Sequence, residues 1–242
     1  LDRAFEKLTL EGAVALKCGL AYCRPLSFDN PTVNEAETIF NSVIQDSVDG
    51  ANWQEAKPMQ DFMVHQIIQR GRSHNLPVQI HTGIQEGNGN YVAYTNPTLL
   101  SNLFLMYGDV KFDIFHAGFP YSRELSVLAK NFPNVYPDMC WMHIIGAASA
   151  RNILDEWLDL IPSNKILAFG GDYRFAEGVY GHAVITRDNV SRVLADRVTR
   201  GDQTMQEAQE IAERILRQNA RDLFRLDELN LPGRYRRTET CL

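Results

Sequence analysis

Short apolar runs alternate along the chain with longer segments in which apolar residues recur three and four positions apart. The short runs have the length of strands and are rich in β-branched and aromatic residues; they lie at 13–16, 78–80, 112–115, 134–136 and 165–169. The segments with helical spacing lie at 54–75, 145–160, 187–198 and 204–226. Strands separated by helices favour parallel pairing through right-handed crossovers, so the pattern predicts an α/β fold.

The chain contains no internal repeat, low-complexity tract or linker rich in proline and glycine. We therefore expect residues 1–242 to form a single domain, which suits their number. Residues 24–52 are interpreted as a long insertion between a strand and its helix, and 229–242 as a polar tail. Thr204 and Glu207 have the spacing of a capping box and predict the start of the last helix.

Composition narrows the class of protein. Hydrophobic residues make up 45% and charged residues 22%, which is typical of a soluble globule with a core. The net charge of −6 argues against a nucleic-acid-binding protein. No apolar run approaches the roughly 18 residues that cross a bilayer, and the first residues lack the layout of a secretion signal. Four cysteines are too few for a disulfide scaffold, so we expect reduced thiols and a cytoplasmic location.

Each strand-like run is followed by a side chain that can bind a metal or move a proton. These side chains belong to Lys17, His81, His116, Asp138 and Asp172. In parallel α/β folds the carboxyl ends of the strands share one edge, where ligands and catalytic groups collect. Two imidazoles and a carboxylate form a mixed nitrogen and oxygen field that suits a divalent cation, above all Zn²⁺. We therefore predict a metal site at this edge.

Each of these residues also has a structural alternative. A histidine after a strand is often a hydrogen-bonded structural residue, which applies to His81. Lys17 could pair with a carboxylate at the rim, and Asp138 and Asp172 could each cap the following helix. The prediction of a metal site therefore depends on these residues occurring together rather than on any one of them.

The other histidines carry less information. His65 and His74 fall in or just after a helical segment and are interpreted as surface or packing residues. His143 and His182 lie in loops that could reach the mouth of the site. Cys140 could be a nucleophile, but a buried thiol is the preferred interpretation.

Four motifs and a closing helix follow one another in a fixed order: His-Thr-Gly (81–83), Phe-His-Ala-Gly (115–118), Asn-Val-Tyr-Pro-Asp (134–138), Ile-Leu-Ala-Phe-Gly-Gly-Asp (166–172) and Gln-Asn-Ala-Arg-Asp-Leu-Phe (218–224). Over about residues 12–226 they resemble the back half of an amidohydrolase-superfamily barrel. The nearest branch is the amidohydrolase-related group of predicted metal-dependent hydrolases, with a fainter likeness to uronate isomerases. The resemblance implies a (β/α)8 TIM barrel, of which this chain supplies about strands 4–8.

The resemblance also implies residue roles. His81 matches the fifth-strand metal ligand, and His116 the sixth-strand histidine, which is a second ligand or polarises a carbonyl. Asp172 matches the eighth-strand aspartate, which binds metal and acts as general base. Lys17 falls where some members carry a carboxylated lysine that bridges two metals. The implied reaction is attack of a metal-activated water on a carbonyl-type carbon.

One feature of the family is absent. No two histidines are two positions apart, so the first-strand His-x-His pair is missing. Five βα units are visible where a barrel needs eight. We therefore expect the C-terminal part of a longer barrel, or one completed by another segment. Alone, the chain would have an incomplete metal site and would expose sheet edges and an apolar barrel lining.

The substrate is expected to be a small molecule. Arg24, Arg123 and Arg174 come just after strand ends and could hold a substrate carboxylate, or could form surface salt bridges. A carboxylate would equally suit a sugar-acid isomerase like the uronate isomerases. The apolar stretch 96–107 is compatible with helix packing or with an interface in a homo-oligomer.

Two further interpretations stay open. A truncated barrel without the first-strand ligands would be a non-catalytic protein, because too few ligands remain to hold a metal. A complete five-stranded doubly wound domain with a ligand crevice is the other, although no Gly-x-Gly-x-x-Gly fingerprint supports nucleotide binding.

Overall fold

The computed structural model describes residues 1–45 and 52–229, so the predicted tail lies, from residue 230 onward, outside the described residues. Four strands form one parallel sheet in the order β1-β2-β3-β4: Leu16–Cys18, Val78–Ile80, Phe112–Ile114 and Val135–Pro137. A parallel bridge between Asp138 and Leu167 adds the fifth run beside β4. The α/β prediction is confirmed, with one shift: β1 begins at Leu16, so Lys17 lies within the strand rather than after it.

Helices cover the four segments predicted from the spacing, and further helices occur outside them. Their bounds are α1 Asp2–Leu10, α2 Val33–Gln45, α3 Trp53–Ser73, α4 Ser101–Met106, α5 Ser122–Asn131, α6 Met142–Ile145, α7 Ala147–Leu160, α8 Ala176–Arg200, α9 Met205–Glu213 and α10 Asn219–Phe224. A π-helical segment, Arg214–Gln218, joins the last two. Short 3-10 turns include η1 Leu20–Tyr22, η3 Pro97–Leu100 and η4 His116–Gly118. The capping box is confirmed, because the side chains of Thr204 and Glu207 accept from each other's backbone N–H.

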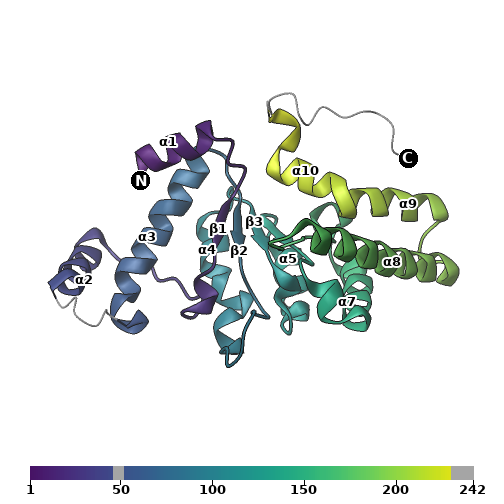
Figure 1. Ribbon diagram of the computed structural model, residues 1–242, viewed down its shortest axis with the longest axis horizontal. Helices are drawn as coiled ribbons and strands as arrows, with labels where there is room; N and C mark the ends of the chain where they lie inside the picture. Colours follow the sequence, from purple (N-terminus) through teal and green to yellow (C-terminus); the bar gives the residue numbers. More distant parts are fainter. Residues whose placement is uncertain (46–51, 230–242) are drawn as a thin grey trace.

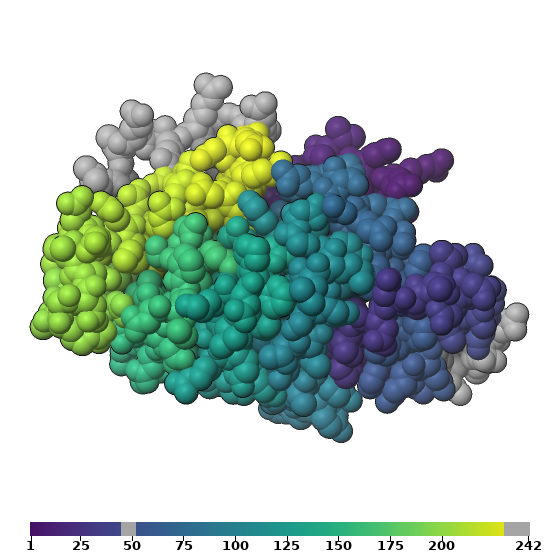
Figure 2. Space-filling model, turned by 180° about the vertical axis from the view of Figure 1, so that it is seen from behind, coloured from purple at the N-terminus to yellow at the C-terminus, as the bar shows by residue number. Residues whose placement is uncertain are grey.

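The sheet stands between two groups of helices (Figure 1). Helices α1 to α3 lie at the β1 end and α7 to α9 at the other, and the view from behind shows the same progression of colours (Figure 2). Helix α2 lies in the predicted insertion 24–52, of which residues 46–51 are outside the described residues. Among residues 1–45 and 52–229, no helix is both long enough and apolar enough to cross a membrane.

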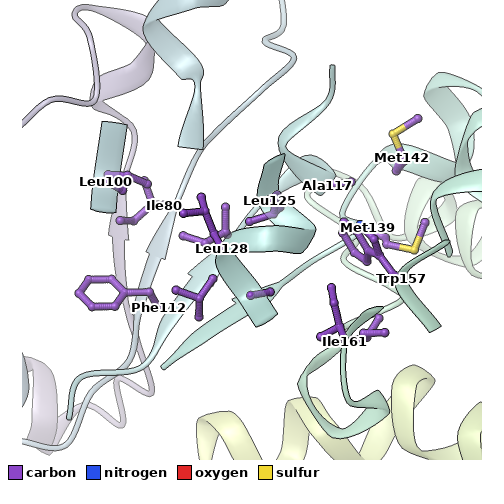
Figure 3. Packing of buried hydrophobic residues seen from close by; sticks show 14 of the residues in the cluster. Ile80, Leu100, Phe112, Ala117, Leu125, Leu128, Met139, Met142, Trp157 and Ile161 are labelled. Atoms are coloured by element: carbon purple, nitrogen blue, oxygen red, sulfur yellow. The ribbon is translucent and has the colours of Figure 1, made fainter. Parts of the chain in front are cut away.

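The main core packs between the sheet and its helices (Figure 3). Ile80 and Phe112 are at most 1% exposed and lie beside Leu100 and Leu125. Burial of each such side chain contributes about 1.5–3 kcal/mol. The stretch 96–107 also supplies buried Leu103, Phe104 and Tyr107, so these side chains serve internal packing.

The opposite face of the sheet is polar. The register places one row across the four strands, made of Lys17, Gln79, Asp113 and Tyr136. Alternate residues of a strand point to opposite faces, so this row faces the inside of the barrel while its apolar neighbours face the helices. The expected apolar lining is therefore wrong for this row. Two members of this row are hydrogen-bonded, since Gln79 Nε2 donates to Asp113 Oδ2 at 2.8 Å.

Candidate metal centre

Two histidines meet at the carboxyl ends of β2 and β3. His81 Nδ1 lies 3.1 Å from His116 Nε2. The other ring nitrogens face backbone carbonyls: His81 Nε2 lies 3.1 Å from the Ile84 oxygen, and His116 Nδ1 lies 2.9 Å from the Cys140 oxygen. Because a carbonyl can only accept, each of these nitrogens carries the proton. In the neutral rings, the two nitrogens that face each other are therefore both unprotonated.

Two unprotonated nitrogens at this distance repel each other unless a proton or a cation lies between them. Burial, the neighbouring His116 and Lys17 lower the pKa of His81 to about 3, and burial also lowers the pKa of His116. At neutral pH the two rings are therefore not expected to share a proton. Two nitrogen ligands of a tetrahedral Zn²⁺ would be about 3.3 Å apart, given bonds of roughly 2.0–2.1 Å. The observed 3.1 Å fits a divalent cation held by both rings.

Glycine holds the two histidine loops together. Gly83 has φ of +65°, and a Cβ there would lie 2.5 Å from backbone atoms of Gly118 and Phe119. Thr82 adds a bond across the same contact, since its Oγ1 donates to the Phe115 carbonyl at 2.7 Å. The His-Thr-Gly motif thus has a local reason: only glycine lets the loop after β2 approach the loop after β3 so closely.

Left-handed backbone concentrates around these loops. His116, Ala117, Trp141 and Asp172 all have φ between +50° and +62°. Such conformations cost about 1–2 kcal/mol for residues other than glycine, and they cluster at functional sites where the surrounding structure imposes them. Three of these residues, His116, Trp141 and Asp172, come from different loops and line the same cavity.

Asp172 and Lys17 complete this region. Asp172 Oδ2 lies 3.9 Å from His116 Nε2, and the Asp172 carbonyl accepts from Trp141 Nε1 at 3.2 Å. Lys17 Nζ lies 3.2 Å from the centre of the Phe115 ring. Burial lowers the pKa of this amine, and the negative charge of Asp172 opposes that shift. The four predicted ligand residues all line one cavity of about 330 Å³.

A buried acid pair lies below the histidines. Asp113 is fully buried, Asp138 is 5% exposed, and Asp138 Oδ1 accepts from the Cys140 backbone N–H at 2.7 Å. Burial raises the pKa of Asp138 to about 7, and burial together with the Asp138 charge raises the pKa of Asp113. At neutral pH a proton is therefore retained in this pair to a substantial degree, so it does not add two full negative charges under the site.

The three arginines lie in different places. Arg24 is fully buried, and its guanidinium donates to Asp61 Oδ1 at 2.6 Å and to the Ser27 carbonyl at 2.8 Å. Arg123 is a surface residue that pairs with Glu156 at 2.8 Å. We therefore withdraw Arg24 and Arg123 as substrate contacts, since both are engaged in ion pairs away from the cavity. Arg174 lines the cavity, as expected.

His143 and His182 lie behind the cavity rather than in it. His143 Nε2 donates to the Ala168 carbonyl at 2.9 Å, just before the segment that carries Asp172. His182 is 1% exposed, and its ring packs against Phe169 and Tyr173, with centroid distances of 5.2 Å and 5.8 Å. Both residues thus support the Asp172 segment from its buried side.

The remaining histidines are packing residues, as predicted. His65 is 2% exposed and hydrogen-bonds through Nδ1 to the Tyr107 hydroxyl at 2.7 Å. His74 stacks on Phe5 with a centroid distance of 5.7 Å. Neither lies at the cavity.

Sequence reasoning missed the position of Cys140. Its thiol is buried, as expected, but one ligand atom each from Cys140, His116 and Asp172 lie within 4.8 Å of one another. The motif that could have revealed this is Asp-Met-Cys, which places the thiol two positions after the strand-end aspartate.

Fold and site together define a class of protein: a parallel βα barrel section with histidines, an aspartate and a lysine at the carboxyl edge of its strands. The sequence profile of the amidohydrolase family (Amidohydro_2) matches residues 44–226. The chain therefore belongs to the amidohydrolase family.

The chain is also similar to one curated protein and to several solved structures. Protein fluG of Emericella nidulans is 32% identical over 180 residues, which are 72% of this chain and 21% of that protein. A structure from Lactobacillus casei ATCC 334, titled "putative metal-dependent hydrolase", superimposes with a TM-score of 0.79 at 22% identity, over 93% of this chain and 58% of that one. Uronate isomerase from Thermotoga maritima gives a TM-score of 0.74 at 17% identity, over 92% and 52%.

The structural likeness confirms the TIM-barrel fold, of which the described residues contain four strands and a fifth run joined by a bridge. The chain spans about half the length of the solved structures and about a fifth of Protein fluG.

Proposed function

We propose that the chain carries active-site residues of a metal-dependent hydrolase that acts on a carbonyl-type carbon. The observation that supports this most strongly is the 3.1 Å distance between His81 Nδ1 and His116 Nε2 in a buried setting, with the other nitrogen of each ring against a backbone carbonyl. His81 Nδ1 and His116 Nε2 would hold the cation, which we propose to be Zn²⁺. Bound there, it would lower the pKa of a coordinated water toward about 7 and supply a nucleophile at neutral pH.

Asp172 is the proposed general base. Its carboxylate faces His116 at 3.9 Å and is 48% exposed, so it can reach both the metal position and a substrate in the cavity. The carboxylate would accept the proton of the attacking water and deliver it to the leaving group. Trp141 holds its backbone by donating to the Asp172 carbonyl, which limits how far the carboxylate can swing.

The cavity suits a small substrate that bears a carboxylate. Its cationic lining groups are Lys17 and Arg174, and its aromatic walls come from Tyr22, Trp141 and Tyr173. A guanidinium can bind a carboxylate through two parallel hydrogen bonds, which fixes orientation as well as charge. The aromatic walls exclude water from the other end of the substrate. A sugar-acid isomerase would use the same cationic groups, so the reaction products distinguish the two activities.

The metal assignment is tested by elemental analysis of the 242-residue chain dialysed against zinc. We expect stoichiometric zinc in the wild type and in the His74→Ala control, whose histidine lies away from the cavity. His81→Ala and Asp172→Asn should hold at least about 10-fold less, since loss even of an outer partner costs that much. Unchanged zinc in both variants would overturn the assignment.

The activity is tested with the same proteins on carboxylate-bearing amides, esters and lactones. Hydrolysis that requires Asp172 supports the proposal. Interconversion of a uronate without net uptake of water would support the isomerase instead, and a zinc-loaded chain without either activity would support a non-catalytic barrel.

A further inference from the structure

Cys140 occupies a constrained position beside the proposed centre. Both of its backbone groups are tied to acid and histidine side chains: the N–H donates to Asp138 Oδ1 at 2.7 Å, and the carbonyl accepts from His116 Nδ1 at 2.9 Å. The side chain is 1% exposed. With both peptide groups fixed, the direction of the Cα–Cβ bond is fixed as well.

The segment that carries Asp172 passes directly over this thiol. A Cβ at Gly170 would lie 2.7 Å from Cys140 Cβ and 3.0 Å from its Sγ. Glycine at position 170 thus leaves the space that the sulfur fills, and it brings the Asp172 carboxylate close to the sulfur. His116 lies on the third side, since one ligand atom from each of the three residues falls within 4.8 Å of the others.

We propose that Cys140 is a thiolate ligand of the cation bound at His116 and Asp172, so that the centre selects soft divalent metals. This inference rests on the proposed metal centre and extends its ligand set. Coordination would break the S–H bond and form a sulfur–metal bond, and the proton would pass to solvent. Burial and the neighbouring carboxylates of Asp138 and Asp172 raise the pKa of the Cys140 thiol, so the thiolate would form only with the cation bound.

A sulfur ligand changes which metals the site prefers. Thiolates favour Zn²⁺, Cd²⁺ and Co²⁺, whereas carboxylates and water suit Mn²⁺ and Mg²⁺. With Cys140 as a ligand, the chain should bind Cd²⁺ much more tightly than Mn²⁺. A serine at this position keeps a similar shape but offers a hard oxygen, so the preference for Cd²⁺ should fall while Mn²⁺ binding changes little.

Cobalt spectroscopy gives a readout that does not depend on activity. The full chain is titrated anaerobically with Co²⁺, and bound cobalt is counted by elemental analysis. We expect a sulfur-to-cobalt charge-transfer band in the near ultraviolet for the wild type. Cys140→Ser should lose the band and bind Co²⁺ at least about 10-fold more weakly. Cys23→Ser, which removes an exposed thiol, is the matched control and should retain it.

Gly170→Ala provides a second variant that keeps the thiol but displaces it. It should weaken or remove the band without removing any sulfur. Cobalt bound with no charge-transfer band, or a band that survives in Cys140→Ser, would overturn this inference and leave the histidine centre standing. A wild-type chain that binds no cobalt would instead overturn the proposed metal function, and this inference with it.

Discussion

Replacing Gly83 with alanine should separate the two histidine loops. The added Cβ would lie 2.5 Å from Gly118 C and from Phe119 N and O, all of them backbone atoms that cannot move alone. The left-handed φ of +65° costs an alanine about 1–2 kcal/mol, and forced overpacking typically costs another 1–3 kcal/mol. We therefore expect a loss of about 2–5 kcal/mol in the free energy of unfolding, measured by urea denaturation.

Gly87→Ala is the matched control for backbone conformation alone. Gly87 also has a positive φ, of +95°, but a Cβ there meets nothing within 4 Å. It should cost only about 1–2 kcal/mol, with no loss of zinc affinity. Gly83→Ala should in addition bind zinc more weakly while still folded, because its clash moves the backbone that carries His81 relative to His116. Equal destabilisation by the two substitutions, or unchanged zinc affinity in Gly83→Ala, would refute the reasoning.

Other expectations concern charge and pH. Arg24→Met should cost about 1.5–3 kcal/mol of stability, because Asp61 would lose its guanidinium partner and keep only Lys57 and the Asp29 backbone N–H, whereas Arg123→Ala should leave urea unfolding nearly unchanged. Arg174→Met should leave stability within about 0.5 kcal/mol but raise KM for a carboxylate substrate in steady-state assays. Burial lowers the pKa of His143 to about 4, so the unfolded state binds more protons below about pH 6.5 and stability falls by up to roughly 3 kcal/mol as the pH drops toward 4. His143→Gln should flatten that dependence in urea titrations at several pH values.

The parallel pairing of the strands could be predicted from the sequence because short apolar runs alternate with segments of helical spacing, whereas their order followed from the resemblance to a barrel. The same logic located His81 and His116, since parallel strands end at a common edge. The predicted position of β1 was wrong: the strand was expected at 13–16, and it is observed at Leu16–Cys18, so it ends two positions later. The strand is set by its pairing of Leu16 with Val78, and no local pattern reveals that register.

Long-range partners explain the other differences. Arg24 has the position of a substrate-binding residue, but it pairs with Asp61, 37 residues away on α3. The polar barrel lining follows from an alternation of apolar and polar residues that is only three positions long in each strand, too short to stand out. The closeness of Cys140 to Gly170 depends on the bridge between Asp138 and Leu167, which sequence spacing does not specify.

The central claim is that two histidine nitrogens share one divalent cation. It is tested most directly by nitrogen NMR of the chain labelled with ¹⁵N-histidine and titrated with zinc, with resonances assigned from His81→Ala and His116→Ala. We predict that zinc shifts His81 Nδ1 and His116 Nε2 together, while His81 Nε2 and His116 Nδ1 stay protonated against their carbonyls. Zinc shifts confined to other histidines, or no shift at either nitrogen, would contradict the account.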